Sequence, residues 1–376
     1  MLKVMTIVGT RPELIKMSRV IAEFDRHTQH VLVHTGQNYD YELNQIFFHD
    51  LEIRRPDHFL EAAGHNAAQT IARVIEKTDE LLAAEQPDAL MLYGDTNSCL
   101  AVIAAKRRKV PVFHMEAGNR CFDQRVPEEL NRKVLDHLSD INLVLTEHAR
   151  RYLIAEGIRP ETIIKTGSHM REVLDHYMHK IQTSNVLQTM GLEQGRYFIV
   201  SAHREENVDS RENLRNLLDT LTALAETYDV PVIVSTHPRT RNMLDSLSGV
   251  ELDARIQFMK PFGFSDYIRL QMESLCVISD SGTITEEASL LNLPAITIRN
   301  AHERPEGMDS GTLIMAGLKK ERVLDAIRVI ISQRSSPGQV VQPVRDYENP
   351  CVSKQVLRVV ESYTDYVNRT VWRKGL

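Results

Sequence analysis

Short hydrophobic runs alternate with amphipathic stretches over almost the whole chain. The hydrophobic runs predict two series of strands, at residues 2–8, 30–35, 89–93, 110–114, 141–145 and 163–166, and at 197–201, 231–236, 256–259, 275–279 and 295–298. Helical periodicity appears between them, at residues 12–24, 66–84, 127–138, 212–227 and 282–291. Apolar strands that alternate with helices are typical of parallel sheets covered by helices on both faces.

The two strand series predict an α/β protein of two Rossmann-like, doubly wound domains. The chain has 376 residues, which suits two domains. The break between the series places the N-terminal domain at residues 1–168 and the C-terminal domain at residues 169–350. A Ser-, Pro- and Gly-rich loop at 335–342 precedes a last helix near 352–366.

Composition excludes several classes of function. Lys and Arg total 45 against 51 Asp and Glu, so the net charge of -6 argues against a non-specific grip on nucleic acid. No hydrophobic stretch approaches the roughly 20 residues that span a bilayer. The four cysteines form no CxxC pair, which argues against a structural zinc site and a disulfide framework. Because the first residues run directly into a strand without a leader, we expect a cytoplasmic protein without membrane contacts.

Charged side chains follow the predicted strands of the first half, where parallel sheets bind ligands. Gly9-Thr10-Arg11-Pro12-Glu13 ends the first strand and starts a helix, with Lys16 one turn in, so this loop is a candidate anion site. Asp95 and Glu116 follow two later strands, and Glu128 opens a helix. Each position alone is also explained by a surface turn or a helix cap. Together they predict carboxylates gathered at one sheet edge.

The second half supplies a complementary set at its strand ends. Two strands lead into His203-Arg204 and His237, and a third leads into Asp280-Ser281-Gly282, with Glu287 a turn later. A Ser-Gly pair at a helix start is an ordinary cap in isolation, but it also suits a diphosphate. An acid one turn later can accept hydrogen bonds from ribose hydroxyls.

Several cofactor motifs are absent. The sequence contains no GxSxG, HExxH, GxGxxG or GxxxxGK[ST] pattern. We therefore expect no nicotinamide, no P-loop and no catalytic metal. The pattern favours acid–base chemistry, without a cofactor, on a ligand that brings its own phosphates.

Seven short motifs in order together resemble the non-hydrolysing UDP-N-acetylglucosamine 2-epimerase family. They are GTRPELIK at 9–16, GDT at 94–96, HMEAG at 114–118, PEELNR at 127–132, HRE at 203–205, DSGTITEE at 280–287 and ERPE at 303–306. The resemblance implies a GT-B-like fold, with the two domains facing across a cleft, and a homodimer. It also implies that residues 351–376 pack back on the N-terminal domain. The implied reaction eliminates UDP from a UDP-sugar to give a 2-acetamidoglycal, and then adds UDP back with C2 inverted.

The resemblance also implies roles for individual residues. Asp95, Glu116 and Glu128 are the acid–base candidates, and His203 is a catalytic polar partner near the diphosphate. Ser281 and Gly282 hold phosphate, and Glu287 holds the ribose. The remaining predicted contacts to the UDP-sugar come from Arg11, Lys16, Arg132, Arg204, His237 and Arg304.

The segments at 35–40 and 118–126 depart from the usual UDP-N-acetylglucosamine pattern. Together with SAHREEN at 201–207, they resemble the branch that converts UDP-2-acetamido-2,6-dideoxy-L-talose to UDP-N-acetyl-L-fucosamine for capsule or O-antigen synthesis. A UDP-N-acetylglucosamine 2-epimerase that gives UDP-N-acetylmannosamine is the alternative. A hydrolysing epimerase, a GT-B glycosyltransferase and a non-enzymatic nucleotide-binding protein also remain open.

Overall fold

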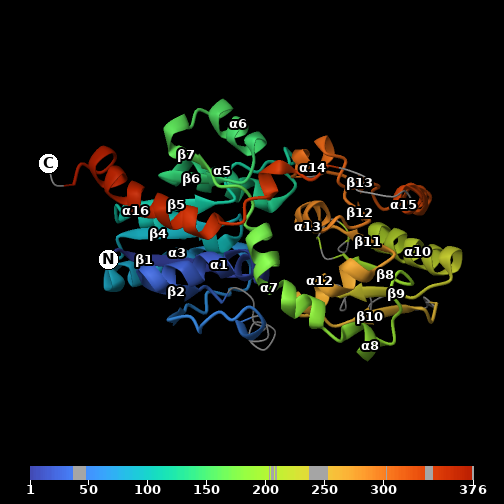
Figure 1. Ribbon diagram of the computed structural model, residues 1–376. Helices are drawn as coiled ribbons and strands as arrows, with labels where there is room; N and C mark the ends of the chain where they lie inside the picture. Colours follow the sequence, from blue (N-terminus) through green and yellow to red (C-terminus); the bar gives the residue numbers. More distant parts are fainter. Residues whose placement is uncertain are drawn as a thin grey trace. The chain divides into compact units, whose positions relative to one another are not determined.

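The computed structural model describes residues 1–36, 48–202, 204, 207, 210–236, 253–301, 303–334 and 342–374. The chain forms two compact units (Figure 1). Unit 1 comprises Met1–His176 together with Asp346–Leu376, and unit 2 comprises Tyr177–Arg345. The sequence placed the divisions at 168 and 350. The first division falls later because α7 (Met170–Thr183) runs from one unit into the other.

A seven-stranded parallel sheet, in the order β3-β2-β1-β4-β5-β6-β7, is the core of unit 1. All five residues of β4 are buried, as expected of a strand covered on both faces. The strands are β1 (Lys3–Val8), β2 (Gln29–His34), β3 (His58–Phe59), β4 (Ala89–Tyr93), β5 (Val112–Met115), β6 (Ile141–Val144) and β7 (Ile163–Lys165).

Helices cover both faces of this sheet. Helix α1 (Arg11–His27) connects β1 to β2, and it packs against the C-terminal helix α16 (Val352–Thr370) (Figure 1). After β3 the chain adds its strands on the other side of β1. Right-handed connections in this direction put the next helices on the opposite face of the sheet. They enclose one hydrophobic core with the strands. These helices are α3 (Ala67–Glu85), η1 (Asn97–Ala101), α4 (Val102–Arg107) and α5 (Pro127–Leu138). The remaining elements are α6 (Glu147–Ala155), η2 (Pro160–Thr162) and η3 (Arg345–Tyr347).

Unit 2 has the same type of architecture, with a six-stranded parallel sheet in the order β10-β9-β8-β11-β12-β13. One face packs on α10 and α15, and the other packs on α8, α12 and α13. The strands are β8 (Phe198–Ser201), β9 (Val232–Ser235), β10 (Ile256–Met259), β11 (Cys276–Ser279), β12 (Ala295–Thr297) and β13 (Ile314–Met315). The helices are α8 (Val186–Met190), α10 (Arg211–Tyr228), α12 (Phe264–Glu273), α13 (Ile284–Leu291), α14 (Pro305–Asp309) and α15 (Lys320–Arg334).

The predicted fold class of two Rossmann-like, doubly wound units is therefore confirmed. In each sheet the strand order reverses at a central pair, β1 and β4 in unit 1 and β8 and β11 in unit 2. Ligands of open parallel sheets bind at such switch points, outside the carboxyl ends of the strands. The loops expected to bind ligands are therefore those after β1, β4 and β5, and those after β8 and β11.

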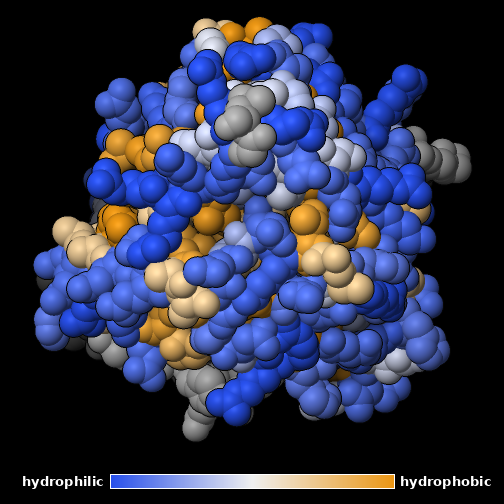
Figure 2. Space-filling model, turned by 90° about the vertical axis from the view of Figure 1, so that its left-hand side faces the viewer, coloured by the Kyte–Doolittle hydropathy of each residue, from blue (hydrophilic) through white to orange (hydrophobic). Residues whose placement is uncertain are grey.

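Hydrophilic residues cover most of the face shown in Figure 2, with separate hydrophobic patches between them. Among the large hydrophobic side chains that stay exposed are Phe122 and Leu130, which are 70% and 69% exposed. None of the described helices is both long and apolar enough to cross a membrane.

Candidate active site

The loop after β1 is anchored by the carboxylate of Glu13. Thr10 caps α1 and Glu13 completes its capping box. The Glu13 carboxylate accepts hydrogen bonds from the backbone N–H groups of Gly9 and Thr10 and from the Thr96 hydroxyl, at 2.6 Å from Thr96. Burial raises the pKa of Glu13 to about 7, although these hydrogen bonds oppose the shift. Glu13 thus joins the loop after β1 to the loop after β4.

Lys16 and Glu116 form a shielded ion pair in unit 1. The Lys16 Nζ atom lies 3.1 Å from Glu116 Oε2, with side-chain exposures of 5% and 14%. It also lies 5.4 Å from the centre of the Tyr93 ring. Arg11, the first residue of α1, is partly buried. Lys16 is therefore placed at the strand ends, but its described partner is a carboxylate.

Glu116 adopts an unusual backbone conformation for a residue with a side chain. Its φ is +64°, in the left-handed region that favours glycine. A Cβ atom at Gly94 would lie 3.9 Å from Glu116 Oε2, so this carboxylate lies beside the loop that carries Asp95. Non-glycine residues in this region are enriched at functional sites.

Asp95 is held by Arg132 on α5. Arg132 Nε donates to Asp95 Oδ2 at 2.8 Å, and Arg132 Nη1 lies 2.9 Å from Glu129 Oε2. The Asn131 side chain donates to the backbone carbonyl of Asp95. Glu128, in the first turn of the same helix, is partly exposed. The three predicted acids therefore all belong to unit 1, and two of them occupy adjoining strand-end loops.

Glu129 has a different environment from Glu128. Its carboxylate accepts the backbone N–H groups of Cys121 and Phe122, both at 3.1 Å. Burial opposes ionisation, but these hydrogen bonds and the Arg132 guanidinium lower the pKa of Glu129 overall. Glu129 therefore stabilises the loop between β5 and α5.

A second cluster lies after β8 and β11 in unit 2. The Asp280 carboxylate is buried and accepts hydrogen bonds from the Arg204 backbone N–H and the Asn207 side chain, both at 3.0 Å. The Ser281 and Thr283 hydroxyl oxygens lie 3.0 Å apart just before α13. Asp280 thus fixes the loop that carries Arg204 beside the start of this helix.

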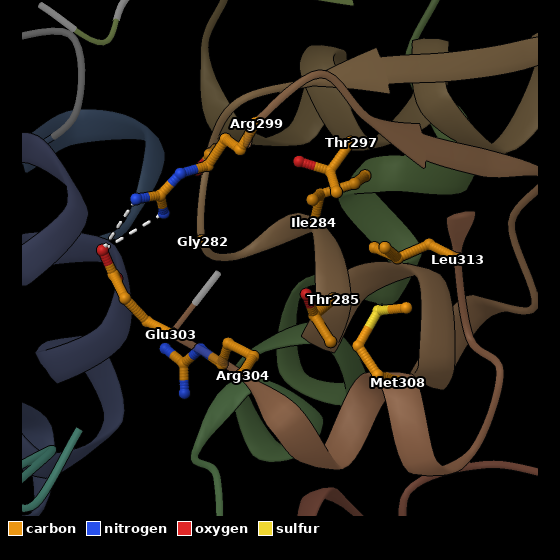
Figure 3. Close-up of a pocket in the computed structure, with 10 residues that line it drawn as sticks. Gly282, Ile284, Thr285, Thr297, Arg299, Glu303, Arg304, Met308 and Leu313 are labelled. Atoms are coloured by element: carbon orange, nitrogen blue, oxygen red, sulfur yellow. Dashed lines mark hydrogen bonds and ion pairs between the residues drawn. The ribbon is translucent and has the colours of Figure 1, made fainter. Parts of the chain in front are cut away.

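A pocket in unit 2 begins at this helix start (Figure 3). Its polar side contains Arg299, whose two terminal nitrogens donate to Glu303 Oε1 at 3.1 Å. Ile284, Met308 and Leu313 form its apolar side (Figure 3). The other lining residues are Ser281, Gly282, Thr285, Thr297 and Arg304. The pocket places a helix N-terminus and the Arg299 and Arg304 guanidinium groups beside an apolar wall, and a helix N-terminus with cationic groups favours an anion.

Two acids in the first turn of α13 have different partners. The buried Glu286 carboxylate pairs with Arg304, whose Nη2 lies 3.0 Å from Glu286 Oε2. The Glu287 carboxylate accepts a hydrogen bond from the buried Gln271 side chain at 2.8 Å. Glu286 therefore orients Arg304, while Gln271 orients Glu287.

The predicted His203 and His237 lie outside the described residues, as does part of the 35–40 segment. In the described part of the chain, no group of three or more His, Cys, Asp or Glu side chains is arranged to hold a metal ion. The sequence also missed Glu13. The capping box of Thr10 and Glu13 was the available signal, but it did not reveal the contact with Thr96.

The chain is similar to a known family of enzymes in both sequence and structure. Residues 22–361 match the profile described as UDP-N-acetylglucosamine 2-epimerase. The structure is similar to that of UDP-N-acetylglucosamine 2-epimerase from Rickettsia bellii, with 60% identity, a TM-score of 0.94 and 100% of both chains covered. It also resembles the Methanocaldococcus jannaschii enzyme solved in complex with UDP-GlcNAc and UDP, with 28% identity, a TM-score of 0.88 and coverage of 96% and 100%.

Two relatives carry different substrate names. A UDP-N-acetylglucosamine 2-epimerase homolog of Methanococcus maripaludis is 35% identical, over 87% of this chain and 92% of its own. A UDP-2,3-diacetamido-2,3-dideoxy-D-glucuronate 2-epimerase of Pseudomonas aeruginosa is 32% identical, over 91% and 94%. The relatives share the position of epimerisation and differ in the sugar.

Proposed function

Because the chain belongs to the UDP-N-acetylglucosamine 2-epimerase family, we propose that it inverts C2 of UDP-2-acetamido-2,6-dideoxy-L-talose to give UDP-N-acetyl-L-fucosamine. The class of enzyme, a UDP-sugar 2-epimerase and thus an isomerase, follows from the family. The substrate is our inference from the altered segments at 35–40 and 118–126. The product would serve capsule or O-antigen synthesis.

The proposed reaction has two balanced stages. A base removes the proton from C2 while the bond from C1 to the UDP oxygen breaks, leaving a C1–C2 double bond and free UDP. UDP then returns to C1, and an acid delivers a proton to the opposite face of C2. Since an acetamido nitrogen replaces the hydroxyl at C2, transient oxidation to a ketone is not directly available. Cleavage at C1 must therefore lead or accompany deprotonation.

Unit 1 would supply the acid–base groups. Asp95, Glu116 and Glu128 move the proton and stabilise positive charge on the sugar ring, which is work worth about 10²–10⁴ in rate. The positions of Asp95 and Glu116 support this proposal most directly. Their carboxylates follow adjacent strands, and Arg132 and Lys16 hold them in place.

Unit 2 would bind the nucleotide. Ser281 and Gly282, with the start of α13, would hold the diphosphate, and Arg204 and Arg304 would stabilise its charge as it departs. Glu287 would accept the ribose hydroxyls. The remaining proposed contacts to the UDP-sugar come from Arg11, Lys16, Arg132 and His237. The remaining proposed catalytic group is His203.

Solvent deuterium exchange tests the proposal. The protein would be incubated in D₂O with UDP-N-acetyl sugars of L-talo, L-fuco, D-gluco and D-manno configuration, and mass spectrometry and NMR would follow C2. We expect deuterium at C2 of the L-talo and L-fuco pair, with the UDP linkage intact by phosphorus NMR. No exchange with any sugar would overturn the epimerase proposal, and release of free sugar would indicate a hydrolase.

A UDP-N-acetylglucosamine 2-epimerase is the second candidate. The similarity to the UDP-N-acetylglucosamine 2-epimerase of Rickettsia bellii, 60% identical to this chain, favours it. Exchange confined to the D-gluco and D-manno pair would identify this activity and reject the L-fucosamine branch. The acceptor-free assay also separates both candidates from a glycosyltransferase.

We also propose a homodimer, which the family resemblance implies. Light scattering coupled to size exclusion gives the mass in solution. A mass of about 86 kDa would support the dimer, twice the 42.9 kDa of one chain. A mass equal to one chain would reject it.

A further inference from the structure

We propose that Asp136 is a positioning residue that holds the loops of Asp95 and Glu116 in the arrangement needed for proton transfer. This inference rests on the proposed function. Asp136 lies on α5 and is buried. Its carboxylate faces three donors from the β5 side: His114 Nδ1 at 3.0 Å, the Gly118 backbone N–H at 3.2 Å and Arg120 Nη1 at 2.7 Å.

Two of these contacts lead directly to the candidate acid–base residues. Gly118 is two residues after Glu116, so its hydrogen bond fixes the turn that places Glu116 at a φ of +64°. A residue in that conformation persists only where surrounding contacts determine it. His114 Nε2 donates to the carbonyl oxygen of Gly94 at 2.7 Å, and Gly94 precedes Asp95. One carboxylate thus reaches both loops.

His114 transmits the contact because both of its ring nitrogens face acceptors. Nε2 faces the Gly94 carbonyl and Nδ1 faces the Asp136 carboxylate, an arrangement that favours the imidazolium form. Burial lowers the pKa of His114, but the hydrogen bond and charge of Asp136 outweigh burial and raise it. Removing the Asp136 charge would therefore weaken the connection to Gly94 as well.

Helix α5 combines these contacts on one face. Glu128, Arg132 and Asp136 are spaced by four residues, so their side chains lie along the same side of the helix. The first is a candidate acid–base residue, the second holds Asp95 and the third holds the Glu116 loop. A single rigid helix therefore sets the relative positions of the three proposed acids.

Asp140 provides a matched control two residues beyond the end of α5. It is also a buried carboxylate, and it pairs with Lys106 and accepts the Val112 backbone N–H at 2.9 Å. Val112 is the first residue of β5, so Asp140 anchors the N-terminal end of this strand, whereas Glu116 follows its C-terminal end. Substitution there removes the charge of a buried carboxylate and its ion pair with the partly exposed Lys106, without touching the strand-end loops.

The test compares Asp136→Asn with Asp140→Asn in the full-length protein. Steady-state kinetics would use the UDP-sugar that the wild type exchanges, with UDP affinity from calorimetry and folding from thermal unfolding. We expect Asp136→Asn to lower kcat on the order of 10²-fold, because small displacements of reacting groups have effects of that size. Its Kd for UDP should stay within about two-fold of the wild type.

Asp140→Asn should lose thermal stability while kcat stays within about two-fold of the wild type. Equal losses of kcat in the two variants would overturn the proposal, because they would indicate general destabilisation. A folded Asp136→Asn protein with wild-type kcat, or with an effect on UDP affinity alone, would also overturn it. In those cases the wild type still exchanges deuterium, so the proposed function survives. A wild type that exchanges with no sugar overturns both.

Arg120→Lys keeps the test decisive if Asp136→Asn does not fold. A lysine retains positive charge but lacks the Nη1 donor that lies 2.7 Å from Asp136 Oδ2, and it also loses the paired hydrogen bonds from Arg120 to Glu156, at 2.8 and 2.6 Å. We expect a smaller loss of kcat than for Asp136→Asn, again without a change in UDP affinity. Wild-type kcat in a folded Arg120→Lys protein would contradict the positioning role.

Discussion

Glu13 carries a buried carboxyl group whose hydrogen-bond partners all belong to strand-end loops. Two partners are backbone N–H groups beside it, and the third is Thr96 on the loop after β4. Burial raises its pKa to about 7 from an ordinary value of 4.5, and the nearby Asp95 charge adds to the shift. The folded protein therefore binds a proton here over a pH range in which the unfolded chain does not.

This difference predicts a pH-dependent stability. Between pH 4.5 and about 7 the folded state binds more protons, so rising pH lowers the free energy of unfolding. Glu13→Gln removes the ionisation and keeps a similar shape. Relative to the wild type, we expect this variant to gain about 3 kcal/mol between pH 4.5 and 7 and little above that. Urea unfolding at a series of pH values measures the difference, and a constant difference would contradict the shift.

The pKa of His34 is shifted in the opposite direction to that of Glu13, so His34 serves as the comparison. Its ring is buried against Phe59, with ring centres 5.0 Å apart, and burial lowers its pKa to about 4 from 6.5. The unfolded chain then binds the extra proton, so stability rises with pH across that interval. A His34→Gln variant should lose this slope, and its difference from the wild type should change with the opposite sign to that of Glu13→Gln. Equal signs in the two series would show that the assignment of either group is wrong.

Candidate site residues could be predicted from the sequence where one short segment contained both the strand end and the reactive side chain. Asp95 and Glu116 follow strands and carry carboxylates, so position and residue type were sufficient to place them at the strand ends, and their catalytic roles stay a prediction. Asp136 was not predicted, because it lies in the last turn of a helix, where it has no strand end beside it in the sequence, and its partners are outside that helix. Such a role depends on tertiary contacts, which no local pattern contains.

At the scale of elements, the loops after β4 and β5 depend on glycine for different reasons. Gly94 and Gly118 have φ angles of +74° and +80°. A Cβ atom at Gly118 would lie 2.6 Å from the carbonyl oxygen of Ala149 on α6, whereas at Gly94 the nearest atom is 3.9 Å away. Gly118 thus permits both a backbone conformation and a close helix approach, and Gly94 permits only the conformation.

The two alanine variants should therefore differ. Gly94→Ala should cost about 1–2 kcal/mol of unfolding free energy, the usual penalty of a side chain in the left-handed region. Gly118→Ala should cost clearly more, because α6 must also move. Urea unfolding of both variants gives the comparison. Equal losses would mean that the Ala149 carbonyl shifts without cost.

Strands and long helices were predicted well from hydrophobic pattern, since full burial of parallel strands leaves near-continuous apolar runs. The predicted strand at residues 256–259 coincides with β10, and the predicted helix at 127–138 coincides with α5. The two-residue strands β3 and β13 were missed. Each joins the sheet at an edge, and a pairing of that length is too short for periodicity to detect.

On the scale of the whole molecule, the two-unit architecture followed from the two strand series, but the division of the chain did not. Unit 1 is discontinuous, because the chain returns to it after unit 2. Helix α16 packs on α1 through a buried apolar side. Amphipathicity indicated a buried face, but only the resemblance to the family suggested which unit would cover it.

This arrangement predicts that a change in the last helix disturbs the first unit selectively. Val360 is buried on α16, whereas Arg358 on the same helix is exposed. Val360→Asp should destabilise unit 1 by more than about 3 kcal/mol, since it buries an unpaired charge. Arg358→Asp should have little effect. Hydrogen exchange with and without UDP would then show lost protection in unit 1 but UDP-dependent protection in unit 2, because the proposed nucleotide contacts of α13 belong to unit 2. Loss of UDP binding in Val360→Asp alone would show instead that the nucleotide site requires an intact unit 1.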